Sequence, residues 1–113
     1  MKVVFHVDEL GMIREARHDI EHILLSEPDA DIVLLMNGEA IQGYLLPRVI
    51  KFMKEYPNIT YQACHHSMRT FHVRSKQMHD QVEIIESGVI GLVELQERGY
   101  SYICLLYTSD AAD

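Results

Sequence analysis

The chain has 113 residues, of which 48% are hydrophobic and 24% charged, with a formal net charge of −7; this is the size and composition of one globular domain. The negative charge argues against direct nucleic acid binding, and no apolar run approaches the roughly 20 residues that a membrane-spanning helix needs. The apolar start is too short for a signal peptide and the two cysteines make no disulfide framework, so we expect a cytoplasmic protein.

Strand and helix patterns alternate in the first third of the chain. Residues 2–7 (KVVFHV) form a β-branched and aromatic run with the length of a buried strand. Apolar residues then recur at helical spacing over 11–25, and residues 31–36 (DIVLLM) predict a second buried strand. Asn37 and Gly38 follow as a turn signal.

The middle of the chain predicts a helix over 39–56, within which Pro47 either kinks the helix or begins a second one. Residues 59–63 predict a third strand that runs directly into Cys64. The segment 68–78 has no clear period and is expected to form one or two short helical turns.

The last third predicts a fourth strand over 82–85 and a helix over 88–97, for which Ser87 is the N-cap. Gly99 ends this helix, and a fifth strand follows over 100–103. Together the elements predict a three-layer α/β/α sandwich of flavodoxin-like type, with a five-stranded, mainly parallel sheet.

Functional residues in such a sheet lie at the carboxyl ends of the strands. Four segments of this chain are predicted to meet there: 6–8, 37–39, 64–67 and 86–88. We therefore expect any reactive or ligand-binding side chains of the domain to lie in these segments.

Cys64 is the strongest candidate, since it stands at the end of a strand and before a possible helix start, where backbone N–H groups favour an anion. A thiolate is the reactive form of cysteine, and such a position lowers the pKa of a thiol. His65, His66 and Arg69 add positive potential, and Ser67 adds a hydroxyl. The alternative is that Cys64 is a buried small apolar residue, which is common for free cysteine.

A metal site is not favoured by the sequence. Cys64 with His6, His65 and His66 could in principle offer soft ligands, but adjacent residues that leave a strand point in opposite directions. No zinc-binding or nucleotide-binding motif is present. The sequence thus predicts neither a metal nor a cofactor.

The final ten residues, 104–113 (CLLYTSDAAD), fit one reading frame of a transposon-end sequencing adapter. We therefore expect the natural domain to cover residues 1–103 and the tail to be non-native. Cys104 then carries no function, which leaves Cys64 as the single cysteine of the domain.

Four segments, which together cover most of residues 1–103, follow one another in the order found in a known protein family: MKVVFHVDE, LLMNGEAIQGYL, ITYQACHHSMR and VEIIESGVIGLVELQERGYSYI. The cysteine segment is the most specific, with Ala-Cys, two small or polar positions, and Ser-Met-Arg. In these features the chain resembles the DsrE/DsrF-like sulfur-relay family.

The resemblance implies a parallel α/β/α fold and a homo-oligomer, a trimer or a hexamer. It also implies that Cys64 accepts persulfide sulfur from a donor protein and passes it to an acceptor protein, with His65, His66, Ser67 and Arg69 around it. The pair His65-His66 departs from relatives that have Asn or another small polar residue there. Because many relatives have no established reaction, the fold transfers more safely than the activity.

Three functions follow from these residues. The first is a sulfur carrier, of sulfurtransferase type if it turns over at all. The second is a non-catalytic oligomeric domain that binds a small molecule or regulates a partner, with Cys64 as a pocket wall. The third is a metal or redox sensor that uses Cys64 and the nearby histidines. Thiol reactivity separates the first from the second, because a carrier needs a fast, accessible thiol.

Overall fold

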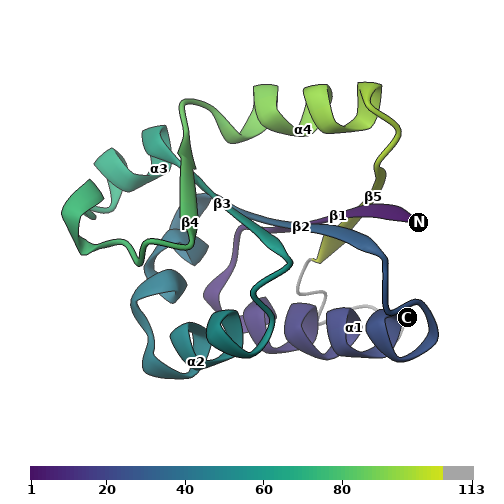
Figure 1. Cartoon of the computed structure of the whole chain (residues 1–113). Helices are drawn as coiled ribbons and strands as arrows, with labels where there is room; N and C mark the ends of the chain where they lie inside the picture. Colours follow the sequence, from purple (N-terminus) through teal and green to yellow (C-terminus); the bar gives the residue numbers. More distant parts are fainter. Residues whose placement is uncertain (106–113) are drawn as a thin grey trace, which may run out of the picture.

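The computed structural model describes residues 1–105, which fold into one parallel sheet covered by helices on both faces (Figure 1). The strand order is β4-β3-β2-β1-β5. The strands are β1 (Lys2–Val7), β2 (Asp31–Met36), β3 (Thr60–Cys64), β4 (Val82–Ile85) and β5 (Ser101–Leu105). This architecture confirms the predicted α/β/α sandwich.

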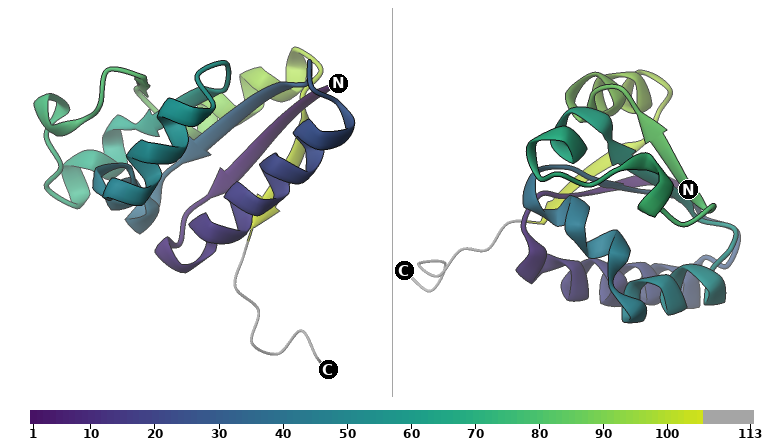
Figure 2. Two further views of the ribbon diagram at one scale, coloured as in Figure 1. Left: turned by 60° about the horizontal axis from the view of Figure 1, so that its bottom comes forward. Right: turned by 90° about the vertical axis from the view of Figure 1, so that its left-hand side faces the viewer.

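The helices divide between the two faces of the sheet. Figure 2 shows α1 (Ile13–Ser26) and α2 (Pro47–Glu55) next to each other on one face, whereas α4 (Gly88–Glu97) covers the other. The 3-10 turns η1 (Leu10–Met12) and η2 (Gly38–Leu45) precede α1 and α2. The short helix α3 (His65–Thr70) and the 3-10 turn η3 (Ser75–Gln77) connect β3 to β4.

The core is unequal on the two faces. The α1–α2 face holds a large apolar cluster that includes Phe5, Ile20, Leu34 and Tyr44, all fully buried. The α4 face holds a small one, made of Val4, Val33, Leu35, Leu95 and Tyr100. Most of the stabilising apolar burial therefore lies on the α1–α2 face.

Two ambiguous segments are settled by the structure. The segment 39–56 is not one helix, because the chain forms η2 and then begins α2 at Pro47, where proline lacks an N–H that the first helical turn does not need. The connection after β3 contains α3 and η3, but α3 begins directly after Cys64, three residues earlier than the ambiguous segment 68–78.

The strand β5 extends two residues into the segment that we expect to be non-native. Cys104 pairs with His6 and Leu105 with Val7, so both residues continue the ladder between β1 and β5. Residues 106–113, the rest of that segment, lie outside the described residues, and the origin of the tail stays a prediction. Within the described part of the chain, no helix is long and apolar enough to cross a membrane.

Candidate functional site

The four predicted segments do meet at the carboxyl end of the sheet, and two hydrogen bonds join segment 64–67 to segments 37–39 and 86–88. The Gly38 N–H donates to the Ser67 hydroxyl (2.8 Å), which ties the end of β2 to the start of α3. The Gly88 N–H, at the first turn of α4, donates to Cys64 Sγ (3.2 Å). The end of β3 is thereby fixed to the loops that follow β2 and β4.

Cys64 is the last residue of β3 and is 4% exposed. Burial raises the pKa of its thiol, but the Ser67 hydroxyl and the backbone N–H groups of Ser67, Gly88 and His66 stabilise the thiolate and lower the pKa below its ordinary value. The lowered pKa fits the sequence argument. The burial is greater than we expected of a carrier thiol.

Gly88 fills a position between Cys64 and Asn37 that has little room for a side chain. A Cβ added at Gly88 would stand 3.3 Å from Asn37 Cβ and 3.4 Å from Cys64 Cβ. A glycine here lets the α4 backbone come close enough for its N–H to reach the sulfur. The Asn37 amide nitrogen would stand 3.4 Å from the same added Cβ, so the carboxamide lies beside Gly88, across from Cys64.

A chain of hydrogen bonds leads from Asn37 to the edge of the sheet. The Asn37 Oδ1 faces His6 Nε2 (2.8 Å), and His6 Nδ1 faces the Tyr102 hydroxyl (2.7 Å). Since Oδ1 can only accept, Nε2 carries the proton and the Tyr102 hydroxyl donates to Nδ1 in the neutral ring. The two bonds hold the carboxamide so that its NH₂ group is directed away from His6.

A charged group lies on the outer side of Cys64. His65 Nδ1 lies 3.1 Å from Arg69 Nη1 and 3.8 Å from Glu86 Oε1, and Arg69 Nη1 lies 4.0 Å from Glu86 Oε2. The Glu86 side chain is 83% exposed, so these pairs contribute little to stability. The carboxylate also offsets part of the positive potential that we predicted from Arg69.

The four binding residues predicted from the sequence thus play different parts. Ser67 hydrogen-bonds to the Cys64 thiolate through its hydroxyl and its backbone N–H. Leaving tyrosine and cysteine aside, it is the only buried polar residue among those described. His66 contributes its backbone N–H while its side chain is exposed. His65 and Arg69 stand on the rim.

Sequence reasoning placed Asn37 and Gly88 in the segments expected to meet at this edge but gave neither a role beside Cys64, and it missed the Tyr102 hydroxyl. The local pattern indicates only a turn at Asn37, and His6 was considered only as a metal ligand. The contact between His6 and Asn37 follows from the sheet, because the two residues lie at the ends of two neighbouring parallel strands. Among residues 1–105, no three His, Cys, Asp or Glu side chains are grouped so that they could hold a metal ion.

Two solved structures share this fold. One is a protein of unknown function, MTH1491 from Methanobacterium thermoautotrophicum, with a TM-score of 0.82 and 18% sequence identity over 91% of this chain and 97% of that one. The other is the YchN protein from E. coli, with a TM-score of 0.71 and 12% identity over 95% of this chain and 100% of that one. At these identities the likeness establishes the fold alone. No family model and no curated protein matches the chain.

Proposed function

We propose that the chain is a DsrE/DsrF-like sulfur carrier that holds sulfane sulfur on Cys64. The observation that carries the proposal is the set of hydrogen-bond donors around the Cys64 thiol. Cys64 ends a strand at the edge where such folds bind ligands, and the Ser67 hydroxyl and backbone N–H groups lower its pKa despite burial. The resemblance of the cysteine segment to the family's acceptor segment adds the chemical identity of the cargo.

The transfer is a pair of thiol–disulfide exchange steps. The Cys64 thiolate attacks the outer sulfur of a donor persulfide, the sulfur–sulfur bond of the donor breaks, and the donor leaves as a thiolate. Cys64 then carries the persulfide. An acceptor thiolate attacks the outer sulfur in turn and releases the Cys64 thiolate, so sulfur moves without any external oxidant or reductant.

The groups around Cys64 stabilise its thiolate, which is present before the attack on the donor and again after the sulfur has been transferred. The Gly88 N–H and the Ser67 hydroxyl stabilise the thiolate both before attack and after transfer. The Asn37 amide, held in place by His6, packs against Gly88, whose N–H group reaches the sulfur. His65 and Arg69 present positive charge to an approaching donor from the rim.

The burial of Cys64 favours a second function, a non-catalytic domain that binds a small molecule. With 4% of the residue exposed, Cys64 presents little surface to a donor protein. In this alternative Cys64 packs against Gly88 and does not react. The two functions differ in one observable, the rate at which the folded protein is alkylated at Cys64.

The test is to incubate the protein with a cysteine desulfurase and cysteine and then to measure intact mass. The carrier gains one sulfur atom, which is lost on reduction and absent in Cys64→Ser. Cys104→Ser is the matched control and keeps the gain. If the wild-type mass does not change, and iodoacetamide labels Cys64 no faster than in the unfolded chain, the non-catalytic function replaces the carrier.

The proposal places the protein in the cytoplasm, where thiols are kept reduced. It also includes self-association. Val89, Ile90 and Val93 on α4 are 67%, 60% and 52% exposed, and a helix with apolar residues on every side is typically buried. We propose a second copy of this chain as the partner of this α4 surface (Val89, Ile90 and Val93), in a trimer or a hexamer. The surface begins one residue after Gly88, so the assembly borders the Cys64 site.

A further inference from the structure

The geometry points to a second site, separate from Cys64, that binds a phosphorylated small molecule with an apolar body. It is built around three arginines, Arg14, Arg17 and Arg48, which line one cavity of about 480 Å³ together with Leu10, Gly11 and Ile13. Arg14 and Arg17 come from α1 and Arg48 comes from α2.

Among residues 1–105 none of the three cavity arginines forms an ion pair, and the carboxylate bound next to the cavity is that of Glu39, which accepts from the N–H of Leu10 (3.0 Å). None of the described residues that line the cavity is acidic. The ion pairs found within residues 1–105 involve Glu86 with His65 and Arg69. In a chain of net charge −7, a cavity lined by three guanidinium groups is a local reversal of the overall potential.

Helix dipoles add to the same potential. Arg14 lies in the first turn of α1 and Arg48 in the first turn of α2, where the positive end of the helix disfavours a cation. Neither helix has a side-chain cap, and α2 has no acidic residue in its first turn. Glu15, in the first turn of α1, does not line the cavity. An anion bound among the arginines would offset both unfavourable terms.

Arg17 supplies an observation of a different kind. Its Nε is buried and has no hydrogen-bond partner within residues 1–105, although buried polar groups are almost always paired. With the cavity empty this atom still has almost no accessible surface, so an oxyanion in the cavity would accept from the other N–H groups of the arginines that line it. Guanidinium groups bind phosphate and carboxylate through paired N–H donors, which explains the use of arginine and not lysine.

A second cavity indicates what the anion is attached to. It has a volume of about 550 Å³ and shares Leu10 and Arg48 with the first. Its wall includes Leu45, Leu46, Phe71 and Val73, and Phe71 is 37% exposed. A ligand that spans both cavities places a charged group among the arginines and an apolar or aromatic group against Phe71.

The experiment is calorimetric titration of the full chain, in phosphate-free buffer, with inorganic phosphate, phenyl phosphate, benzoate and phenol. We expect phenyl phosphate to bind about tenfold or more tighter than inorganic phosphate, because the ring buries apolar surface. Phenol lacks the charge and should not bind measurably. Benzoate separates the anion classes: weaker binding than phenyl phosphate supports a phosphate site, and equal or tighter binding overturns that assignment.

Two variants and one control locate the binding. Arg17→Ala removes the buried Nε, and the double variant Arg14→Ala/Arg48→Ala removes the two exposed arginines, so a folding defect in the first leaves the second informative. The control Lys51→Ala/Lys54→Ala removes the same charge from exposed positions of α2. Loss of phenyl phosphate binding in the double variant but not in the control supports the site. Equal binding by the double variant and wild type, or no binding by wild type, overturns it.

Discussion

The two faces of the sheet differ in what they contain. Toward α1 and α2, the strands present a large cluster of apolar side chains with almost no exposure. Toward α4, the carboxyl ends of β1, β2, β3 and β5 present His6, Asn37, Cys64 and Tyr102. On this face β1 and β2 contribute only Val4, Val33 and Leu35 to the small apolar cluster.

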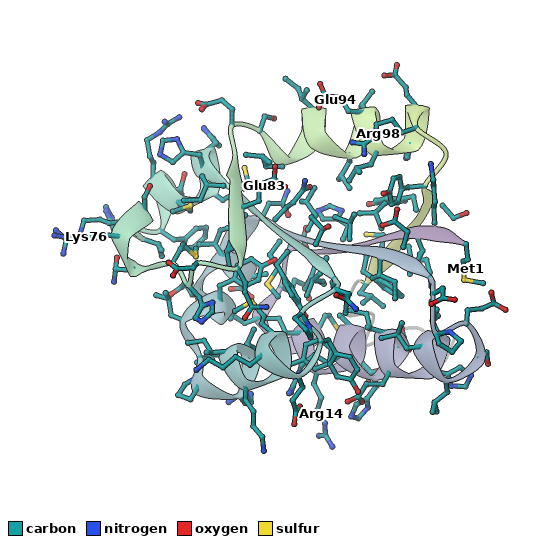
Figure 3. The ribbon with its side chains drawn as sticks, in the orientation of Figure 1. Met1, Arg14, Lys76, Glu83, Glu94 and Arg98 are labelled. Carbon is teal, nitrogen blue, oxygen red and sulfur yellow. The ribbon has the colours of Figure 1, made fainter. Side chains whose placement is uncertain are left out.

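The face toward α1 and α2 therefore supplies most of the stabilising apolar packing, and the candidate site lies on the other face. Polar groups and a thiol held beside donors cost free energy in a core, so they gather where the packing is thin and where the chain has loops to position them. The helix α4 itself carries both charged and exposed apolar side chains. Figure 3 shows Glu94 on this helix and Arg98 one residue after its end, and the exposed Val89, Ile90 and Val93 lie on its amino-terminal half.

The largest expected effect breaks the stabilising face. Ile20, on α1, is fully buried in the large cluster, and Ile20→Ala should lower the free energy of unfolding by about 3–5 kcal/mol. Leu95→Ala, in the small cluster on α4, should cost about 2–3 kcal/mol because fewer neighbours surround it. Urea denaturation measures both. Leu25→Ala, at a position on α1 that is 86% exposed, is the control and should change stability by less than about 0.5 kcal/mol. A larger loss for Leu95 than for Ile20 would contradict the assignment.

Self-association through the α4 surface gives the next largest effect. Ile90→Glu places a charge in an interface that the proposal makes apolar and should weaken assembly by about a hundredfold, roughly 2.7 kcal/mol. Light scattering at micromolar concentration reads out the mass. Glu94→Gln, one residue beyond the surface on the same helix, serves as the control. A wild-type mass near the 13.1 kDa of one chain would refute self-association.

The Ser67 hydroxyl gives a smaller effect that involves both stability and chemistry. Ser67→Ala leaves the Gly38 N–H without its acceptor and should cost about 1–3 kcal/mol. It also removes a group that lowers the pKa of Cys64, so alkylation at neutral pH should slow. Thr70→Ala, at an exposed position of α3, tests whether any change in α3 has this effect. An alkylation rate in Ser67→Ala equal to that of wild type would remove Ser67 from the site.

The order of the strands was predictable, because each strand is a short apolar run, and α1 and α4 could be recognised by a helical period or a cap. Residues 31–36 and 82–85 needed nothing beyond local composition, and Ser87 accepts from the Ile90 N–H (3.3 Å) as an N-cap should. The position of Cys64 at the carboxyl end of β3 was predictable for the same reason, although β3 and β5 begin and end one or two residues later than predicted.

The partners of Cys64 were less predictable. Glycine at position 88 matters because of what approaches it in space, and Asn37 matters because His6 fixes its amide. The three cavity arginines appeared scattered in the sequence because they come from two helices that meet only in the fold. Such groupings depend on tertiary packing, which local patterns do not contain.

A still smaller effect is the pH dependence of stability. The pKa of Cys64 is lower in the folded chain than its ordinary value of 9.0, so the unfolded state binds more protons between the folded and the ordinary pKa. The resulting stabilisation is complete above the ordinary pKa and is lost as the pH falls through the folded pKa. Urea denaturation of wild type and Cys64→Ser across this window should show that the difference in unfolding free energy moves in favour of wild type as the pH rises. A difference that does not vary with pH would mean that the two states share one thiol pKa.

The most direct test of the account is the pH dependence of iodoacetamide alkylation at Cys64, in the folded Cys104→Ser chain and in the same chain unfolded. The account predicts that the folded chain reacts with a midpoint below that of the unfolded chain, and that Asn37→Asp, which puts a carboxylate beside Gly88, whose N–H group binds the sulfur, moves the midpoint up again. A midpoint at or above that of the unfolded chain would show that burial dominates the thiol, and would contradict the claim that this face of the sheet prepares Cys64 for chemistry.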